Sequence, residues 1–112
     1  MAKYMVLYYS SVSASQLMAN ASMEKMKASI EEWQKWKDGA SKVAKIEFGM
    51  PLEAVKHITL EGTSASDSKV GGYSIVEGES KEAIVELMKT HPHLKRPGAS
   101  IDLLEMITMP GL

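Results

Sequence analysis

The sequence predicts a single α+β domain in which two helices cover one face of a sheet. Three observations support this fold class. The chain has 112 residues, the length of one domain. Its apolar segments alternate between strand-like and helix-like periodicity. Residues 71–109 read as strand, helix and strand in succession.

Five segments predict strands. Residues 3–9 are continuously apolar, which is typical of a strand in the middle of a sheet that is covered on both faces. Residues 43–48 and 55–60 are shorter candidates, and residues 71–77 and 100–109 complete the set. Between them, residues 49–51 predict a turn, residues 61–69 a mobile loop or hairpin tip, and residues 110–112 a tail.

The first helix is predicted over residues 19–38, after a serine-rich loop at residues 10–15. Gly39 is expected at the left-handed position that follows a helix. Apolar side chains at spacings of 3, 4 and 3 place one stripe on this helix, formed by Met23, Met26, Ile30 and Trp33.

The second helix is predicted over residues 81–90. Ser80 is a favourable N-cap, and Glu82 lies in the first turn, where the helix dipole favours a negative charge. Pro92 restricts the backbone of His91, so the helix is expected to end near Thr90.

The predicted order is β-α-β-β-β-α-β, a ferredoxin-like split β-α-β arrangement with one added strand or hairpin. The helices cover one sheet face. Because apolar residues occur on both sides of the terminal strands, the other face needs a partner. We therefore expect a homodimer formed by sheet packing.

Composition narrows the class of protein. The net charge of −1 gives no reason to expect nucleic acid or an anionic membrane as a partner. The absence of cysteine excludes disulfides, thiolate metal sites and cysteine nucleophiles. The apolar run near the N-terminus spans only about six residues, short for a signal peptide, and no run approaches the roughly 18 residues of a membrane span. A soluble cytoplasmic protein is expected.

Six short motifs occur in order along the chain. They are Trp36 with Asp38-Gly39, Gly49-Met50-Pro51-Leu52, Gly72-Tyr73-Ser74-Ile75-Val76, Ser80 with Glu82-Ala83, Pro92-His93-Leu94, and Gly98-Ala99-Ser100-Ile101 with Glu105. Each motif alone is unspecific. The ordered set, from Lys3 to Met109, resembles the YCII-related proteins of the dimeric α+β barrel group.

The resemblance implies a ferredoxin-like protomer, a homodimer and a cleft between each sheet and its helices or loops. Some similar proteins have a His–Asp pair in that cleft, and one branch is a lyase that eliminates halide from a chlorinated ring. Two features of this chain depart from the pattern. It has no histidine before His57, and Leu60-Glu61-Gly62-Thr63 stands near where another branch has Asp-Gly-Pro-Phe.

The pair His91 and His93, on either side of Pro92, is the first candidate site. A neutral imidazole can accept a proton or ligate a metal near pH 7. The structural alternative is that His91 completes the helix stripe and that His93 is a turn residue. A metal site needs about three ligands, and although His57 and Glu105 could complete one, no spacing requires it. No metal and no cofactor are expected.

His57 is the second candidate, as a general base on the same strand face as Thr59. Its carboxylate partner would be Asp38, Glu47 or Asp102, because a carboxylate behind a histidine fixes its tautomer and raises its basicity. The alternative is an exposed polar strand face.

Aromatic residues form the third group. Trp36, at the edge of the helix stripe, and Tyr73 are expected to be pocket walls, although core packing is the alternative for Tyr73 and for Trp33. The sequence thus predicts a small-molecule cleft with acid–base chemistry of a lyase or isomerase type. His93, His57 and Asp38 are the expected catalytic residues, and Trp36, Tyr73 and His91 the ligand-binding ones. The alternative is a non-catalytic ligand-binding or interaction module that acts as a homodimer.

Overall fold

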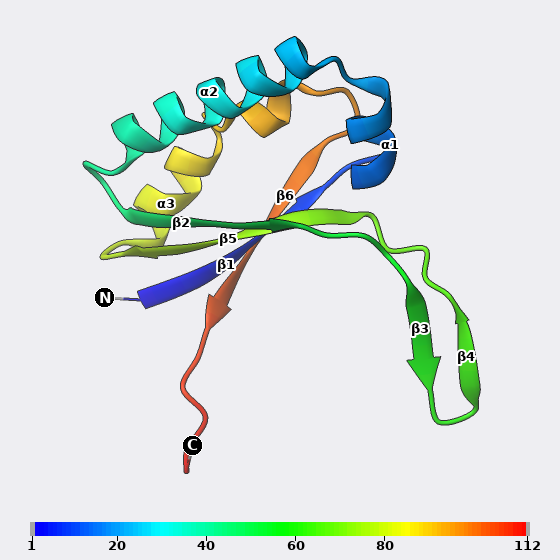
Figure 1. Cartoon of the computed structure of the whole chain (residues 1–112). Helices are drawn as coiled ribbons and strands as arrows, with labels where there is room; N and C mark the ends of the chain where they lie inside the picture. Colours follow the sequence, from blue (N-terminus) through cyan, green and yellow to red (C-terminus); the bar gives the residue numbers. More distant parts are fainter. Residues whose placement is uncertain (1, 112) are drawn as a thin grey trace.

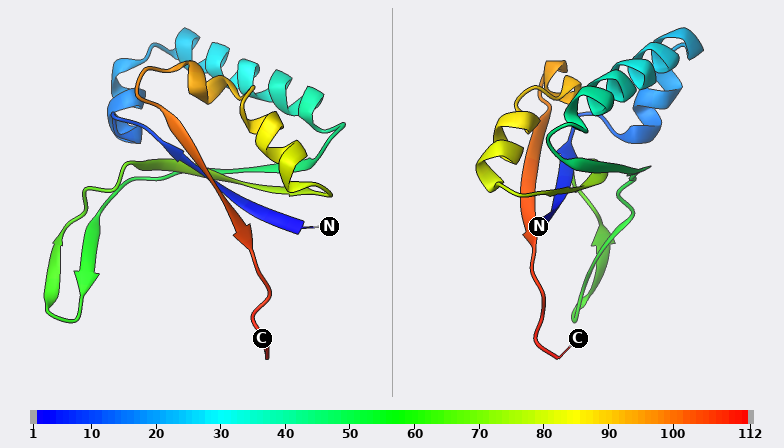
Figure 2. Two further views of the ribbon diagram at one scale, coloured as in Figure 1. Left: turned by 180° about the vertical axis from the view of Figure 1, so that it is seen from behind. Right: turned by 90° about the vertical axis from the view of Figure 1, so that its left-hand side faces the viewer.

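A computed structural model describes residues 2–111 as a mixed α+β domain with a four-stranded antiparallel sheet in the order β2-β5-β1-β6 (Figure 1). The helices lie on one face of this sheet, and the other face is open (Figures 1 and 2). None of the helices between residues 2 and 111 is long and apolar enough to cross a membrane. The elements are β1 (Ala2–Tyr9), α1 (Ala14–Asn20), α2 (Met23–Ala40), β2 (Lys45–Pro51), β3 (Lys56–Thr59), β4 (Gly62–Ala65), β5 (Val70–Gly78), α3 (Lys81–Met88), the 3-10 helix η1 (Pro92–Lys95) and β6 (Ser100–Met106).

The strand predicted over residues 3–9 is confirmed as β1, which lies between β5 and β6 in the interior of the sheet. Its alternate residues Tyr4, Val6 and Tyr8 are buried on the helix-covered face. Val76 of β5 and Ile84 of α3 join the same core. Burial of these side chains holds the helices on the sheet, because removing apolar surface from water makes the largest favourable contribution to the free energy of folding.

The loop predicted over residues 10–15 and the single helix over 19–38 are wrong in their boundaries. α1 begins at Ala14, and Ser13 caps it in a reciprocal capping box with Gln16. Ser22 then caps α2, whose first residue is Met23. The sequence predicts Ser13 in a loop and Ser22 inside a helix, whereas both are N-caps that start helices.

The predicted helix end at Gly39 and the predicted turn at residues 49–51 are also wrong. α2 continues through Gly39 to Ala40, and Gly39 has no positive φ. Residues 49–51 are not a turn but the end of β2, where the register with β5 shifts between Phe48 and Pro51. A bulge adds a residue to one strand without ending it, so a Gly-Met-Pro sequence is compatible with continued pairing.

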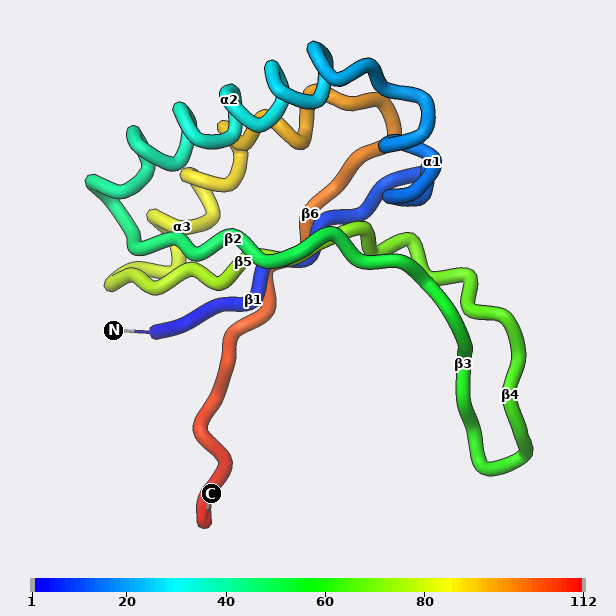
Figure 3. The backbone as a smooth tube through the Cα atoms, viewed as in Figure 1, coloured from blue at the N-terminus to red at the C-terminus, as the bar shows by residue number. Residues whose placement is uncertain are grey.

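β3 and β4 form a separate two-stranded hairpin. This agrees with the predicted added hairpin, and β4 lies within the segment predicted as a mobile loop. The hairpin projects beyond the sheet on the side opposite the helices (Figures 1 and 3). It is exposed along its whole length, including Ile58 and Leu60, which are 72% and 103% exposed. A lone hairpin with exposed apolar side chains has little stability of its own.

The C-terminal half follows the sequence prediction closely. Ser80 caps α3 by accepting the Ala83 N–H, and α3 ends at Met88, two residues before Thr90. β6 ends at Met106, so the predicted strand is too long by three residues. Of the predicted tail, Leu112 lies outside the described residues.

Gly49 allows the Tyr73 ring to lie directly over its backbone, since a Cβ at this position would collide with three ring atoms. We predict that Gly49→Ala lowers the free energy of unfolding by about 1–3 kcal/mol, the usual cost of overpacking. Thermal or urea denaturation measures the change. In a Tyr73→Ala background the same substitution should cost much less, because the ring atoms that the Cβ meets are gone.

Gly39→Ala is the matched control for this prediction. A Cβ at Gly39 meets no atom within 4 Å, and the residue lies inside α2. The same substitution should therefore stabilise the protein by about 0.5–1 kcal/mol through helix propensity. Equal effects of the two substitutions would contradict the packing of Tyr73 on Gly49.

Candidate functional site

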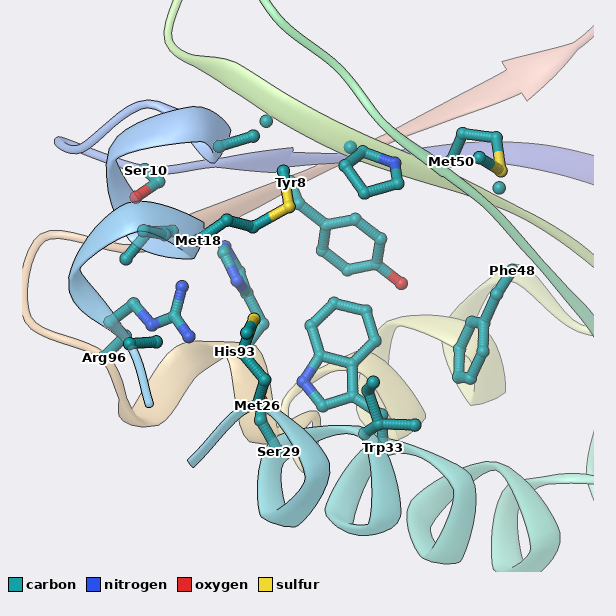
Figure 4. A pocket seen from close by; sticks show the side chains of 18 of the residues that line it. Tyr8, Ser10, Met18, Met26, Ser29, Trp33, Phe48, Met50, His93 and Arg96 are labelled. Atoms are coloured by element: carbon teal, nitrogen blue, oxygen red, sulfur yellow. The ribbon is translucent and has the colours of Figure 1, made fainter. Parts of the chain in front are cut away.

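The principal cavity lies between the two N-terminal helices and one end of the sheet, and has a volume of about 560 Å³ (Figure 4). α1 and α2 form one wall, β2 and β5 the opposite wall, and η1 closes one end. Most of its lining is apolar. Met18, Met26, Ile30, Trp33, Phe48 and Met50 are among the lining residues.

This cavity explains the stripe predicted on α2. Met26, Ile30 and Trp33 all line it, so the stripe faces the cavity and only partly the core. Ile30 consequently remains 63% exposed, and Met23, at the start of the helix, is 83% exposed. The helical periodicity correctly predicted that these side chains lie on one face of α2, but that face borders the cavity.

Beside this cavity, His91 forms the centre of a buried polar network. The imidazole is 2% exposed. Its Nδ1 accepts the backbone N–H of His93 at 3.0 Å, so the neutral ring has its proton on Nε2. Nε2–H donates to the Tyr8 hydroxyl at 3.0 Å, and that hydroxyl is hydrogen-bonded to Ser74 Oγ at 2.7 Å. The network joins β1, β5 and η1.

Burial keeps this network uncharged at neutral pH. It lowers the pKa of His91 to about 3, and the neighbouring His93 acts in the same direction. Burial raises the pKa of Tyr8 to about 12, against the opposing effect of its hydrogen bond with Ser74. His91 is therefore a structural hydrogen-bonding group rather than a base poised near pH 7.

His93 is the histidine that reaches the cavity lining. Its Nε2 donates to the Tyr9 carbonyl at 2.9 Å. Burial lowers the pKa of His93, backbone hydrogen bonds to Tyr9 and Ser100 oppose that shift, and the charge of Arg96 adds to it. The imidazole is consequently neutral at pH 7 and lies at one end of an apolar cavity.

Aromatic rings enclose the two histidines. Trp33 lies edge-on to His91, with ring centroids 4.5 Å apart, and contacts Tyr8 at 5.0 Å. Trp36 also packs on His91, with ring centroids 4.2 Å apart, and its Nε1–H donates to Thr90 Oγ1. Trp36 therefore supports the floor of the site and is not among the cavity-lining residues, whereas Trp33 and Tyr73 are.

The other predicted catalytic residues lie apart from the cavity. His57 is exposed on the β3–β4 hairpin, and Asp38 lies exposed near the end of α2. Neither belongs to the lining. Glu105, the suggested metal ligand, pairs with Lys81 at 3.5 Å. Within residues 2–111, no three His, Asp or Glu side chains are grouped so as to hold a metal ion.

Several lining residues were not identified from the sequence, namely Tyr8, Met18, Lys25, Phe48 and Arg96. They come from four separate elements and one loop. Met18 belongs to a helix that was predicted only in part. A second hollow of about 270 Å³ shares Ser10, Val12 and Gly71 with the cavity and contains Glu53 and Asp67.

Comparison of the chain with models of known protein families and with curated proteins finds no match.

The buried histidines predict that stability falls in acid. His91 has a folded pKa of about 3 and an ordinary value of 6.5, so between these pH values the unfolded state binds the extra proton. The free energy of unfolding should fall by roughly 1.4 kcal/mol for each pH unit below 6.5, and His93 adds to the loss. Urea denaturation from pH 7 to pH 4 measures this slope.

The His91→Gln variant should have a shallower slope than the wild type over this range, because the titrating ring is gone. His57→Gln, which replaces an exposed imidazole, is the control and should keep the wild-type slope. A His91→Gln slope identical to that of the wild type would show that His91 is not held neutral by burial.

Proposed function

We propose that this protein binds a small, largely apolar molecule in the cavity between α1, α2 and the sheet. The observation that supports this most directly is the cavity itself. Its volume of about 560 Å³ lies within the roughly 300–1,000 Å³ usual for small-molecule sites. Its walls are mainly apolar, with a few polar groups at one end, which is the composition such sites have.

The rigidity of the floor also supports binding. The hydrogen bonds among His91, Tyr8 and Ser74 hold the side chains below the cavity, and Trp33 packs on both rings. No buried side-chain polar atom within the described chain lacks a partner. A preformed site loses less conformational entropy on binding than a flexible one.

A second candidate function is acid–base catalysis of a lyase or isomerase type. The observation that favours it is the neutral imidazole of His93 in the lining, because a neutral imidazole can accept a proton. His57 and Asp38 would have no part in such a reaction, since they lie outside the cavity. His93 would act with the bound molecule alone.

We also propose that the fold is ferredoxin-like and that the chain is related to the YCII family. Support comes from the strand order β2-β5-β1-β6, in which the first and third strands of the main sheet are central and the second and last are at its edges. This is the order expected of two split β-α-β units.

We further propose a homodimer in which two open sheet faces pack together, as in a dimeric α+β barrel. Alternation along the strands places half-buried apolar side chains on this face, and Leu104 and Met106 are 49% and 45% exposed there. The hairpin and the C-terminal segment project on the same side (Figure 2). The residues are Met5, Leu7, Tyr9, Ile75, Leu104 and Met106.

The dimer predicts a mass of two chains in light scattering at micromolar concentration. Leu104→Arg should give a monomer, because it places a charge between the two packed faces. Val85→Arg is the matched control, since Val85 is a similarly exposed aliphatic residue on α3, away from the open face. A wild-type monomer would exclude the dimer.

For the cavity, the prediction is saturable binding of N-phenyl-1-naphthylamine, an uncharged probe whose fluorescence rises in an apolar environment. Ser29→Phe should weaken binding at least about tenfold by filling the cavity that Ser29 lines. Ala28→Phe is the control, because the neighbouring Ala28 lies on α2 outside the lining. Equal binding by both variants would place the probe elsewhere.

Molecules that bind can then be followed by NMR for slow chemical change. Acid–base catalysis requires a change that His93→Gln abolishes while binding persists. If bound molecules stay chemically unchanged over days, acid–base catalysis is contradicted and ligand binding alone is the function.

A further inference from the structure

We propose that the ligand of this cavity is an organic carboxylate, with an apolar, ring-containing body and one acidic group held by Arg96 and Lys25. This inference rests on the proposed binding function and adds the chemical class of the ligand.

The charged residues of the lining are all of one sign. Arg96 and Lys25 belong to it, and no Asp or Glu does. The chain as a whole is almost balanced, with 13 basic and 14 acidic residues. The cavity lining is therefore more positively charged than the chain as a whole. His93 is neutral and does not change this positive charge. A positive potential inside an apolar cleft favours an anionic ligand.

The backbone of Arg96 is held by two hydrogen bonds, and its side chain lacks a counterion among the described residues. Its N–H donates to the His93 carbonyl at 3.3 Å, and its own carbonyl accepts the Ala99 N–H at 3.1 Å. The adjacent Lys95 pairs with Glu32 at 3.0 Å, whereas Arg96 has no ion-pair partner within residues 2–111. A guanidinium group binds a carboxylate through two parallel hydrogen bonds, which is the strongest pairing available here.

Lys25 supports the same conclusion by its position. It lies in the first turn of α2, where the helix dipole disfavours a positive charge. Its backbone N–H is already occupied by the Ser22 cap. A bound anion would offset the lysine charge and would add to the negative charge that Glu24 already places in the first turn of this 18-residue helix.

The apolar part of the cavity fixes the orientation of the ligand. Arg96 lies beside His93 at one end, and Phe48 and Met50 lie at the other end (Figure 4). Trp33 and Phe48 meet edge to face, with centroids 5.5 Å apart, and offer aromatic surface to a ring. Methionine side chains adapt to ligands of different outline. The acidic group should therefore lie at the Arg96 end and the ring near Phe48.

The test compares 1-naphthaleneacetate with 2-(1-naphthyl)ethanol, which have the same ring system and nearly the same size but differ in charge. Binding of each to the full chain is measured by calorimetry at low salt. We expect the carboxylate to bind about tenfold more tightly, the usual gain from a charged hydrogen bond at a partly exposed site. Arg96→Gln and Lys25→Gln should each reduce this preference and leave alcohol binding unchanged.

Lys95→Gln and Lys27→Gln are the controls, because they remove neighbouring charges that lie outside the lining. Arg96→Lys keeps the charge and should retain part of the preference, which separates charge from folding defects. Equal binding of the two compounds to the wild type would overturn the carboxylate inference and leave the proposed binding function intact. Failure of both compounds and of the neutral naphthylamine probe would overturn binding itself.

Discussion

The hydrogen-bonded position of the His91 imidazole is the constraint on which the arrangement of the site depends. Nδ1 accepts a hydrogen bond from the His93 backbone N–H in η1, and Nε2 is hydrogen-bonded to the Tyr8 hydroxyl on β1. Because the ring is enclosed by two tryptophans, its charged form is strongly disfavoured and the hydrogen bonds keep one direction. This fixes the path from α3 to β6, and with it His93 and Arg96 at the end of the cavity.

The cavity lies where the N-terminal helical segment is divided in two. α1 and α2 are separated by Ala21 and Ser22, and side chains of both helices line the space between them and the strands. The cost is apolar surface left in contact with water on α2, notably Ile30. Exposed apolar surface that faces a cleft with polar groups at one end is typical of a binding site.

The sequence predicted the strands and the second helix well, because their signals are local. The continuous apolar run of β1, the Ser80 cap and the proline after His91 each act within a few residues. The errors also have local causes. A serine can end a loop or start a helix, as Ser13 and Ser22 do, and the choice depends on what the following residues pack against. Among the candidate site residues, His93 and Tyr73 line the cavity, whereas His91 and Trp36 lie packed beside it.

The sequence by itself determined the α+β class, the central strand and which side chains share a face of each element. Those properties follow from periodicity and capping, which are encoded by neighbours along the chain. Only the tertiary structure decided what each face meets. Tyr8, Lys25, Phe48 and Arg96 are far apart in the sequence and come together solely because β1, α2, β2 and the turn after η1 converge. A site assembled from distant elements leaves no contiguous motif, since each residue is chosen by contacts that form only after folding.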